Sequence, residues 1–131
     1  MLPELGHFAL ILALLLAGVQ AFFGLAAPAL HRDRWLAAVV PATAGHAVMV
    51  ATAFGCLVAS FVRFDFSVAY VAQNSNSALP LVYRIAAVWG AHEGSLLLWI
   101  VLLACWTVAA AFGVARLPPR FAARVLGVLG L

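Results

Sequence analysis

The chain has 131 residues, of which 67% are hydrophobic and only 8% are charged, and its formal net charge is +3. Soluble domains are about half apolar and about a quarter charged, so these few charges cannot cover a water-facing surface. The composition excludes an ordinary soluble domain and predicts an integral membrane protein.

The first predicted element is a membrane-spanning helix over residues 5–30, which carry no formal charge. About 20 apolar residues suffice to cross a bilayer as a helix. A cleaved signal peptide is the competing interpretation, with small residues at Ala26 and Ala27 as a possible cleavage site. Its leading region would carry Glu4 in place of a positive charge, and its apolar run would be about twice the usual length. The sequence therefore favours a span that is retained.

A second spanning helix is predicted over residues 35–62, beginning near Trp35, a typical interfacial anchor. We expect Pro41 to kink it, since proline removes a backbone hydrogen bond. His46 follows near the bilayer midplane and is the most deeply placed histidine. A hydrogen bond to a neighbouring helix is the favoured role for His46, and a ligand or proton-relay role is the alternative.

Residues 63–84 are predicted to form an outer loop between the second and third spans. Phe64, Phe66, Val68 and Tyr70 alternate with polar or small residues, a period that favours an extended segment. Asparagines and serines at 74–77 then predict a turn.

The third spanning helix is predicted over residues 86–115, and a fourth from about residue 121. The fourth apolar run ends with the sequence after about seven residues, too few to span. The chain is therefore expected to be the N-terminal piece of a larger polytopic protein. The predicted fold class is all-α, a polytopic transmembrane protein with three spanning helices and a truncated fourth.

Arginine placement predicts the orientation in the membrane, since the chain has no lysine. The loop after the first span and the segment after the third carry five arginines (Arg32, Arg34, Arg116, Arg120 and Arg124), against Arg63 and Arg84 in the second loop. The positive-inside rule places the first and third connections in the cytoplasm and the N-terminus outside. This bias accounts for the net charge, so no nucleic-acid partner is expected.

His92 and Glu93 stand side by side at the mouth of the third apolar run. Ionisable groups at membrane depth are costly and usually mark functional sites. At helical spacing His92, Trp99 and Trp106 share a face, with Trp89 one turn outward. One interpretation is a surface for a large flat ligand. The other is interfacial tryptophans beside a histidine that bonds a neighbouring helix.

The remaining candidate residues point to packing. Gly90 and Gly94 form a Gly-x-x-x-Gly pair, which permits close approach between helices. Cys56 and Cys105 stand singly and are expected to be small buried residues. We find no metal-ligand spacing, phosphate loop or nucleophile motif, and therefore predict no catalytic and no metal-binding residue.

Five stretches carry a resemblance to a known family: PELGHFAL (3–10), DFSVAYVA (65–72), NSNS (74–77), LP (79–80) and WGAHEGSLLLW (89–99). In this order they resemble the N-terminal part of the CcmF-type family, the large haem-handling membrane proteins of bacterial cytochrome c maturation. The resemblance covers nearly the whole chain, and the last stretch is the most specific.

The resemblance implies a multi-pass protein of the bacterial inner membrane with a periplasmic N-terminus. It implies a haem lyase, which takes haem from a periplasmic carrier and joins it to an apocytochrome c prepared by thiol-handling chaperones. The family's tryptophan-rich haem segment and axial histidines lie further along, so no haem ligand is expected in this chain. Alone it is not expected to be catalytic. We expect Trp89, His92, Glu93 and Trp99 to support the haem site.

A haem-independent small-solute or proton-coupled membrane transporter subunit is the alternative function. In that case His46 and the His92–Glu93 pair would relay protons or hold a small solute within the membrane.

Overall fold

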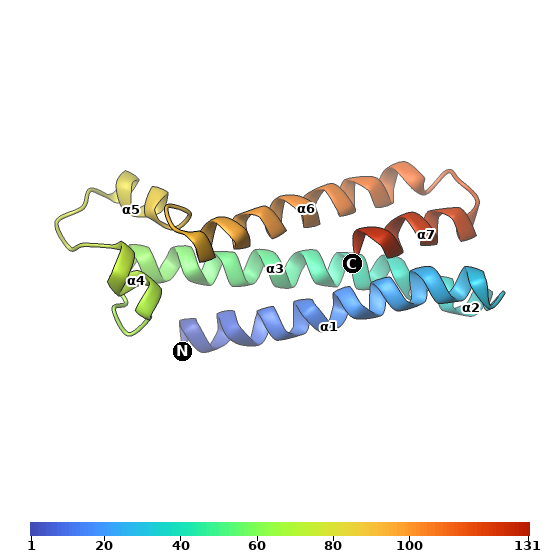
Figure 1. The fold of residues 1–131 in the computed structure, drawn as a ribbon, viewed down its shortest axis with the longest axis horizontal. Coiled ribbons are helices and arrows are strands. Elements are labelled where there is room, and N and C mark those ends of the chain that lie inside the picture. The colour runs from blue at the N-terminus through green and yellow to red at the C-terminus, as the bar shows by residue number, and fades with distance from the viewer.

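The computed structural model describes residues 1–131 as an all-helical chain, which confirms the predicted fold class (Figure 1). Its seven helices are α1 (Leu2–Ala29), α2 (Asp33–Leu36), α3 (Val39–Val62), α4 (Ala69–Asn74), α5 (Leu81–Ala87), α6 (His92–Val114) and α7 (Pro119–Leu129). Three segments are long and apolar enough to cross a membrane: Leu2–Ala29, Asp33–Val62 and His92–Val114.

Helix α3 lies between α1 and α6 and packs on both (Figure 1). Small residues bring α1 and α3 together: a Cβ at Gly6 would lie 3.2 Å from the Cβ of Cys56, and one at Gly45 would lie 3.1 Å from Leu16. Such small residues let apolar helices approach closely in a membrane. Toward the other end of the bundle, α7 packs against α1, α6 and α3.

The second span differs from the predicted helix over 35–62, because α2 and α3 are separate helices. Pro41 lies in the first turn of α3 and is not the site of a kink. The first four backbone amides of a helix have no partner within it, so a proline there breaks no hydrogen bond.

The outer loop contains helix α4 (Ala69–Asn74), so the predicted extended segment is wrong. The backbone is extended at Val68, just before the helix, and at Ser75, just after it. Helix formation turns Val71 inward, where it is completely buried in a cluster with Phe61 and Val88. Burial of this side chain outweighs the weak alternation of the sequence.

The third long helix begins at His92, whereas the prediction placed its start at residue 86. Helix α5 ends at Ala87, and an extended Ala91 (φ −122°, ψ 175°) immediately precedes α6. His92 and Glu93 therefore form the first turn of the helix and do not lie inside it.

Helix α7, predicted from about residue 121, begins at Pro119 and is anchored on α1. A Cβ at Gly127 would lie 2.9 Å from the backbone of Gly24, so the two helices touch through glycines. The buried Gln20 donates a hydrogen bond from Nε2 to the carbonyl of Leu126, at 2.6 Å. Arg120 pairs with Asp33 of α2 through both carboxylate oxygens.

Candidate functional site

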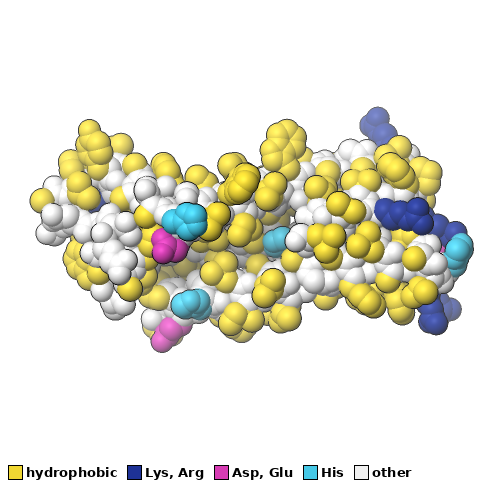
Figure 2. Space-filling model, viewed as in Figure 1, with side chains coloured by type: hydrophobic (Ala, Val, Ile, Leu, Met, Phe, Trp, Pro, Cys, Tyr) yellow, Lys and Arg dark blue, Asp and Glu magenta, His cyan; other side chains and the backbone are white.

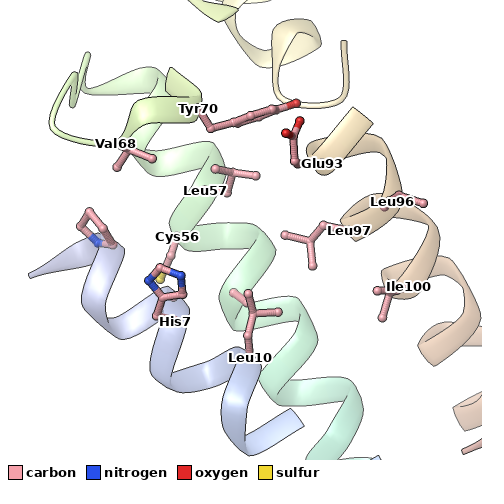
Figure 3. A pocket seen from close by; sticks show the side chains of 13 residues that line it. His7, Leu10, Cys56, Leu57, Val68, Tyr70, Glu93, Leu96, Leu97 and Ile100 are labelled. Carbon is pink, nitrogen blue, oxygen red and sulfur yellow. The ribbon is translucent and has the colours of Figure 1, made fainter. Parts of the chain in front are cut away.

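A groove of about 400 Å³ opens between α1, α3 and α6, at the end of the bundle where α1 and α6 begin (Figure 3). Helix α4 contributes to it from the outer loop. Its lining is Pro3, Gly6, His7, Leu10, Ala53, Cys56, Leu57, Val68, Tyr70, Glu93, Leu96, Leu97 and Ile100.

The groove is mostly apolar and has a few polar side chains at its outer end. Glu93 and Tyr70 lie next to each other at the start of α6, while His7 lies beside Cys56 on the side of α1 (Figure 3). A concave apolar surface with a few convergent polar groups is the usual form of a small-molecule site. Figure 2 shows acidic and histidine side chains toward this end of the molecule, a further histidine at the opposite end, and arginines mainly at that opposite end.

Tyr70 connects three parts of the chain around the outer end of the groove. Its hydroxyl donates to the carbonyl oxygen of Val88 and accepts from the backbone N–H of Gly94, both at 3.1 Å. Its ring packs edge-on against Phe61, with ring centroids 5.6 Å apart. One side chain from α4 thus holds the segment before α6 to the first turn of α6.

Gly94 is the glycine that permits this arrangement. A Cβ at Gly94 would overlap the carbonyl of Val88 and press on the Tyr70 hydroxyl, whereas one at Gly90 would meet Ala87 at 3.5 Å, an ordinary contact. The Gly-x-x-x-Gly pair was predicted to bring another helix close to α6, and this prediction is wrong about what packs against the glycines. Gly94 faces the preceding loop and Tyr70, and Gly90 has no close packing role.

The structure separates the four predicted site residues. Glu93 lines the groove, but Trp89, His92 and Trp99 do not. The sequence predicted Trp89 to lie on the same helix as His92, one turn outward. Trp89 instead lies in the break between α5 and α6. His92 is exposed in the first turn, and Trp99 and Trp106 are 64% and 72% exposed on the surface of α6.

His46 lies half-buried on α3, and its ring makes no hydrogen bond within residues 1–131. The hydrogen bond favoured from the sequence is therefore not formed with any helix of this segment. Cys56 is buried as expected, but Cys105 is exposed on α6, contrary to the prediction.

Two residues that organise this end of the molecule were not predicted from the sequence to have a role at the site. One is Tyr70, whose role depends on a contact with Gly94, 24 residues later. The other is Arg84, which donates from Nη1 to the carbonyl of Val62 at 2.9 Å and lies 4.1 Å over the ring of Phe64. Arg84 thereby closes the C-terminal end of α3, and only its charge in an apolar region marked it in the sequence.

The groove offers few groups to an iron porphyrin. Its lining has one carboxylate and no arginine to pair with anionic substituents. No three His, Cys, Asp or Glu side chains of residues 1–131 are placed to hold a metal ion.

Comparison with known proteins gives consistent matches along the whole chain. The chain is 53% identical over 131 residues to the cytochrome c-type biogenesis protein CcmF of Pseudomonas aeruginosa, covering 100% of this chain and 20% of that protein. It is 45% identical over 137 residues to CcmF of Escherichia coli, covering 100% of this chain and 20% of that protein. No family model matches the chain.

A solved structure named cytochrome c heme lyase CcmF has the same fold, with a TM-score of 0.92 at 31% identity. The match covers 99% of this chain and 22% of that one. The chain thus spans about a fifth of the length of the curated relatives it matches. The predicted resemblance is confirmed over this segment.

Proposed function

We propose that this chain, as a segment of the CcmF-type family, takes part in cytochrome c biogenesis as a portion of a haem lyase. The observation that supports this proposal is that the chain matches these proteins along its whole length, at 53% sequence identity to one relative and with a TM-score of 0.92 to a solved structure. The lyase would receive haem from a periplasmic carrier and attach it to apocytochrome c, which thiol-handling chaperones deliver.

The outer end of α6 is the proposed contribution of this segment to the haem site. Trp89 and His92 are exposed there, beside the Glu93 carboxylate, and Trp99 continues the exposed aromatic surface along α6. Aromatic and apolar surface suits a porphyrin, and the iron ligands would come from the rest of the lyase. These residues support the site as part of its wall, and the segment alone is not catalytic.

Charge distribution supports an orientation with this end in the periplasm. Arginines gather mainly at the opposite end of the bundle (Figure 2), and the positive-inside rule assigns that end to the cytoplasm. With membrane lipid around the three spans, the proposal is a multi-pass protein of the bacterial inner membrane with its N-terminus outside.

The test is a chimera in which this chain replaces the matching segment of the Pseudomonas aeruginosa relative, in a strain that lacks that relative. We expect the chimera to restore covalently bound haem in c-type cytochromes, measured by haem staining of separated proteins. An absence of holocytochrome while the chimera is present in the membrane at the normal level would overturn the proposed function.

His92 tests the site within the same chimera. We expect His92→Ala to lower the holocytochrome yield several-fold, because it removes an imidazole from the exposed first turn of α6. His31→Ala is the matched control, since His31 is also exposed but lies next to Arg32, between α1 and α2. A normal yield from His92→Ala would exclude a direct role for this histidine.

The transporter alternative receives no support from the relatives, which are named for cytochrome c biogenesis.

A further inference from the structure

We infer that Tyr70 is a positioning residue for the proposed haem site: its hydroxyl fixes the first turn of α6 and so sets the directions of His92 and Glu93. This inference rests on the proposed function for its consequence. Its structural basis is independent, because it depends only on contacts among α4, the break after α5 and the start of α6.

The start of α6 has no cap from its own sequence. The first amides of a helix have no partner within the helix, and a polar side chain at the N-cap usually accepts one of these hydrogen bonds. Here the N-cap residue is Ala91, which has no such group. The Tyr70 hydroxyl takes that role from 24 residues away, by accepting the N–H of Gly94 at 3.1 Å.

The same hydroxyl also holds the other side of the break. It donates its proton to the carbonyl of Val88 at 3.1 Å, so one oxygen joins the first residue of the break to the third residue of α6. The distance across the break is thereby fixed. This matters because Trp89, His92 and Glu93 all lie between the two hydrogen bonds.

Tyr70 is itself held firmly. Its ring packs on Phe61, which is completely buried, and its neighbour Val71 is buried against Val88. Asn74 donates from Nδ2 to the Tyr70 carbonyl at 2.9 Å. The hydroxyl therefore reaches a fixed point, beside the Glu93 carboxylate at the rim of the groove (Figure 3).

Tyr70→Phe isolates this role, because it keeps the ring packing and removes only the hydroxyl. Tyr83→Phe is the matched control: Tyr83 is 65% exposed and its hydroxyl makes no hydrogen bond within the chain. In the isolated chain in detergent micelles, we expect the Gly94 amide to exchange hydrogen about tenfold faster in Tyr70→Phe, the effect of one lost hydrogen bond. Tyr83→Phe should leave this exchange rate unchanged.

In the chimera, we expect Tyr70→Phe to lower holocytochrome yield several-fold at an unchanged membrane level, and Tyr83→Phe to leave it normal. A double-mutant cycle separates positioning from general destabilisation. If Tyr70 acts through Glu93, the loss caused by Tyr70→Phe should shrink in a Glu93→Gln background.

Each result decides the inference. A normal yield from Tyr70→Phe, or losses that simply multiply with those of Glu93→Gln, would overturn the positioning role. An unchanged Gly94 exchange rate would overturn the hydrogen bond itself. Failure of the unsubstituted chimera would instead remove the proposed function and leave the exchange result standing.

Discussion

Gly94 lies in the first turn of α6, where Val88 and Tyr70 cover its backbone. The carbonyl of Val88 occupies the space that a side chain would need, and the Tyr70 hydroxyl binds the adjacent amide. Only a residue without a side chain at position 94 therefore lets Val88 and Tyr70 pack directly against the first turn of α6. Local backbone freedom is not the reason, because no glycine in the chain has a positive φ.

We expect Gly94→Ala to destabilise the folded chain by about 1–3 kcal/mol, the usual cost of overpacking a close contact. The added methyl group must displace either the Val88 carbonyl or the Tyr70 hydroxyl. The measurement is denaturant unfolding in detergent, followed by tryptophan fluorescence. Gly55→Ala is the control, since nothing lies within 4 Å of its Cβ position, and unfolding equal to that of Gly55→Ala would contradict the expected clash.

At the scale of single residues, the sequence identified His92 and Glu93 but not Tyr70, which lies beside the start of their helix. His92 and Glu93 stood out because ionisable groups are rare in so apolar a chain. Tyr70 did not, since a tyrosine in an aromatic loop is ordinary until α4 meets the start of α6. Its hydrogen bonds depend on tertiary contacts that no local spacing encodes.

Helix α7 is the element whose packing closes one end of the bundle. It has 11 residues and touches α1 through Gly24 and Gly127, while Arg120 at its start pairs with Asp33. The ion pair is exposed on both sides, so its contribution is small. The glycine contact is the one that allows the helices to touch.

We expect Gly127→Leu to release α7 from α1, because the larger side chain would collide with the backbone of Gly24. Trypsin cleavage after Arg124, in the middle of α7, should then become several-fold faster, since cleavage requires the helix to open locally. Gly113→Leu is the control, because open space surrounds Gly113 on α6. Equal cleavage rates for the two variants would show that the glycine contact does not hold α7.

The number of spanning helices was predicted correctly, but the residues at which helices begin and end were not. Long uncharged runs predict spanning helices, and three are present. The breaks at residues 37–38 and 88–91 fall inside apolar sequence, so hydropathy gives no sign of them. The position of the second break depends on how Val71, Val88 and Tyr70 pack together. This packing is a tertiary contact, so it cannot be predicted from the local sequence.

The whole molecule is a bundle closed by α7 at its arginine end and open at the other, where the groove lies. Composition predicts a membrane protein, because so few charges cannot cover a water-facing surface, and the long uncharged runs predict that it spans the membrane as helices. The groove was not predicted, since it depends on α1 and α6 both packing on α3. Trp99, which the sequence predicts to support the haem site, lies outside the groove on the exposed surface of α6.

We expect the isolated chain to bind no stoichiometric haem. The groove has a single carboxylate and no arginine, and no cluster of metal-binding side chains is present in residues 1–131. The measurement is the Soret absorbance of the chain purified from haem-producing cells, relative to its protein concentration. A stoichiometric Soret band that disappears in His46→Ala or His92→Ala would contradict this expectation and assign a haem ligand to the segment.

The hydrogen bond from Gln20 to the carbonyl of Leu126 joins residues 106 positions apart. During synthesis, Gln20 leaves the ribosome long before Leu126 is made, so this hydrogen bond cannot form until then. Contacts between such distant residues form late. The first helix of this chain is thus inserted early, whereas its contact with α7 forms only after α7 has been synthesised.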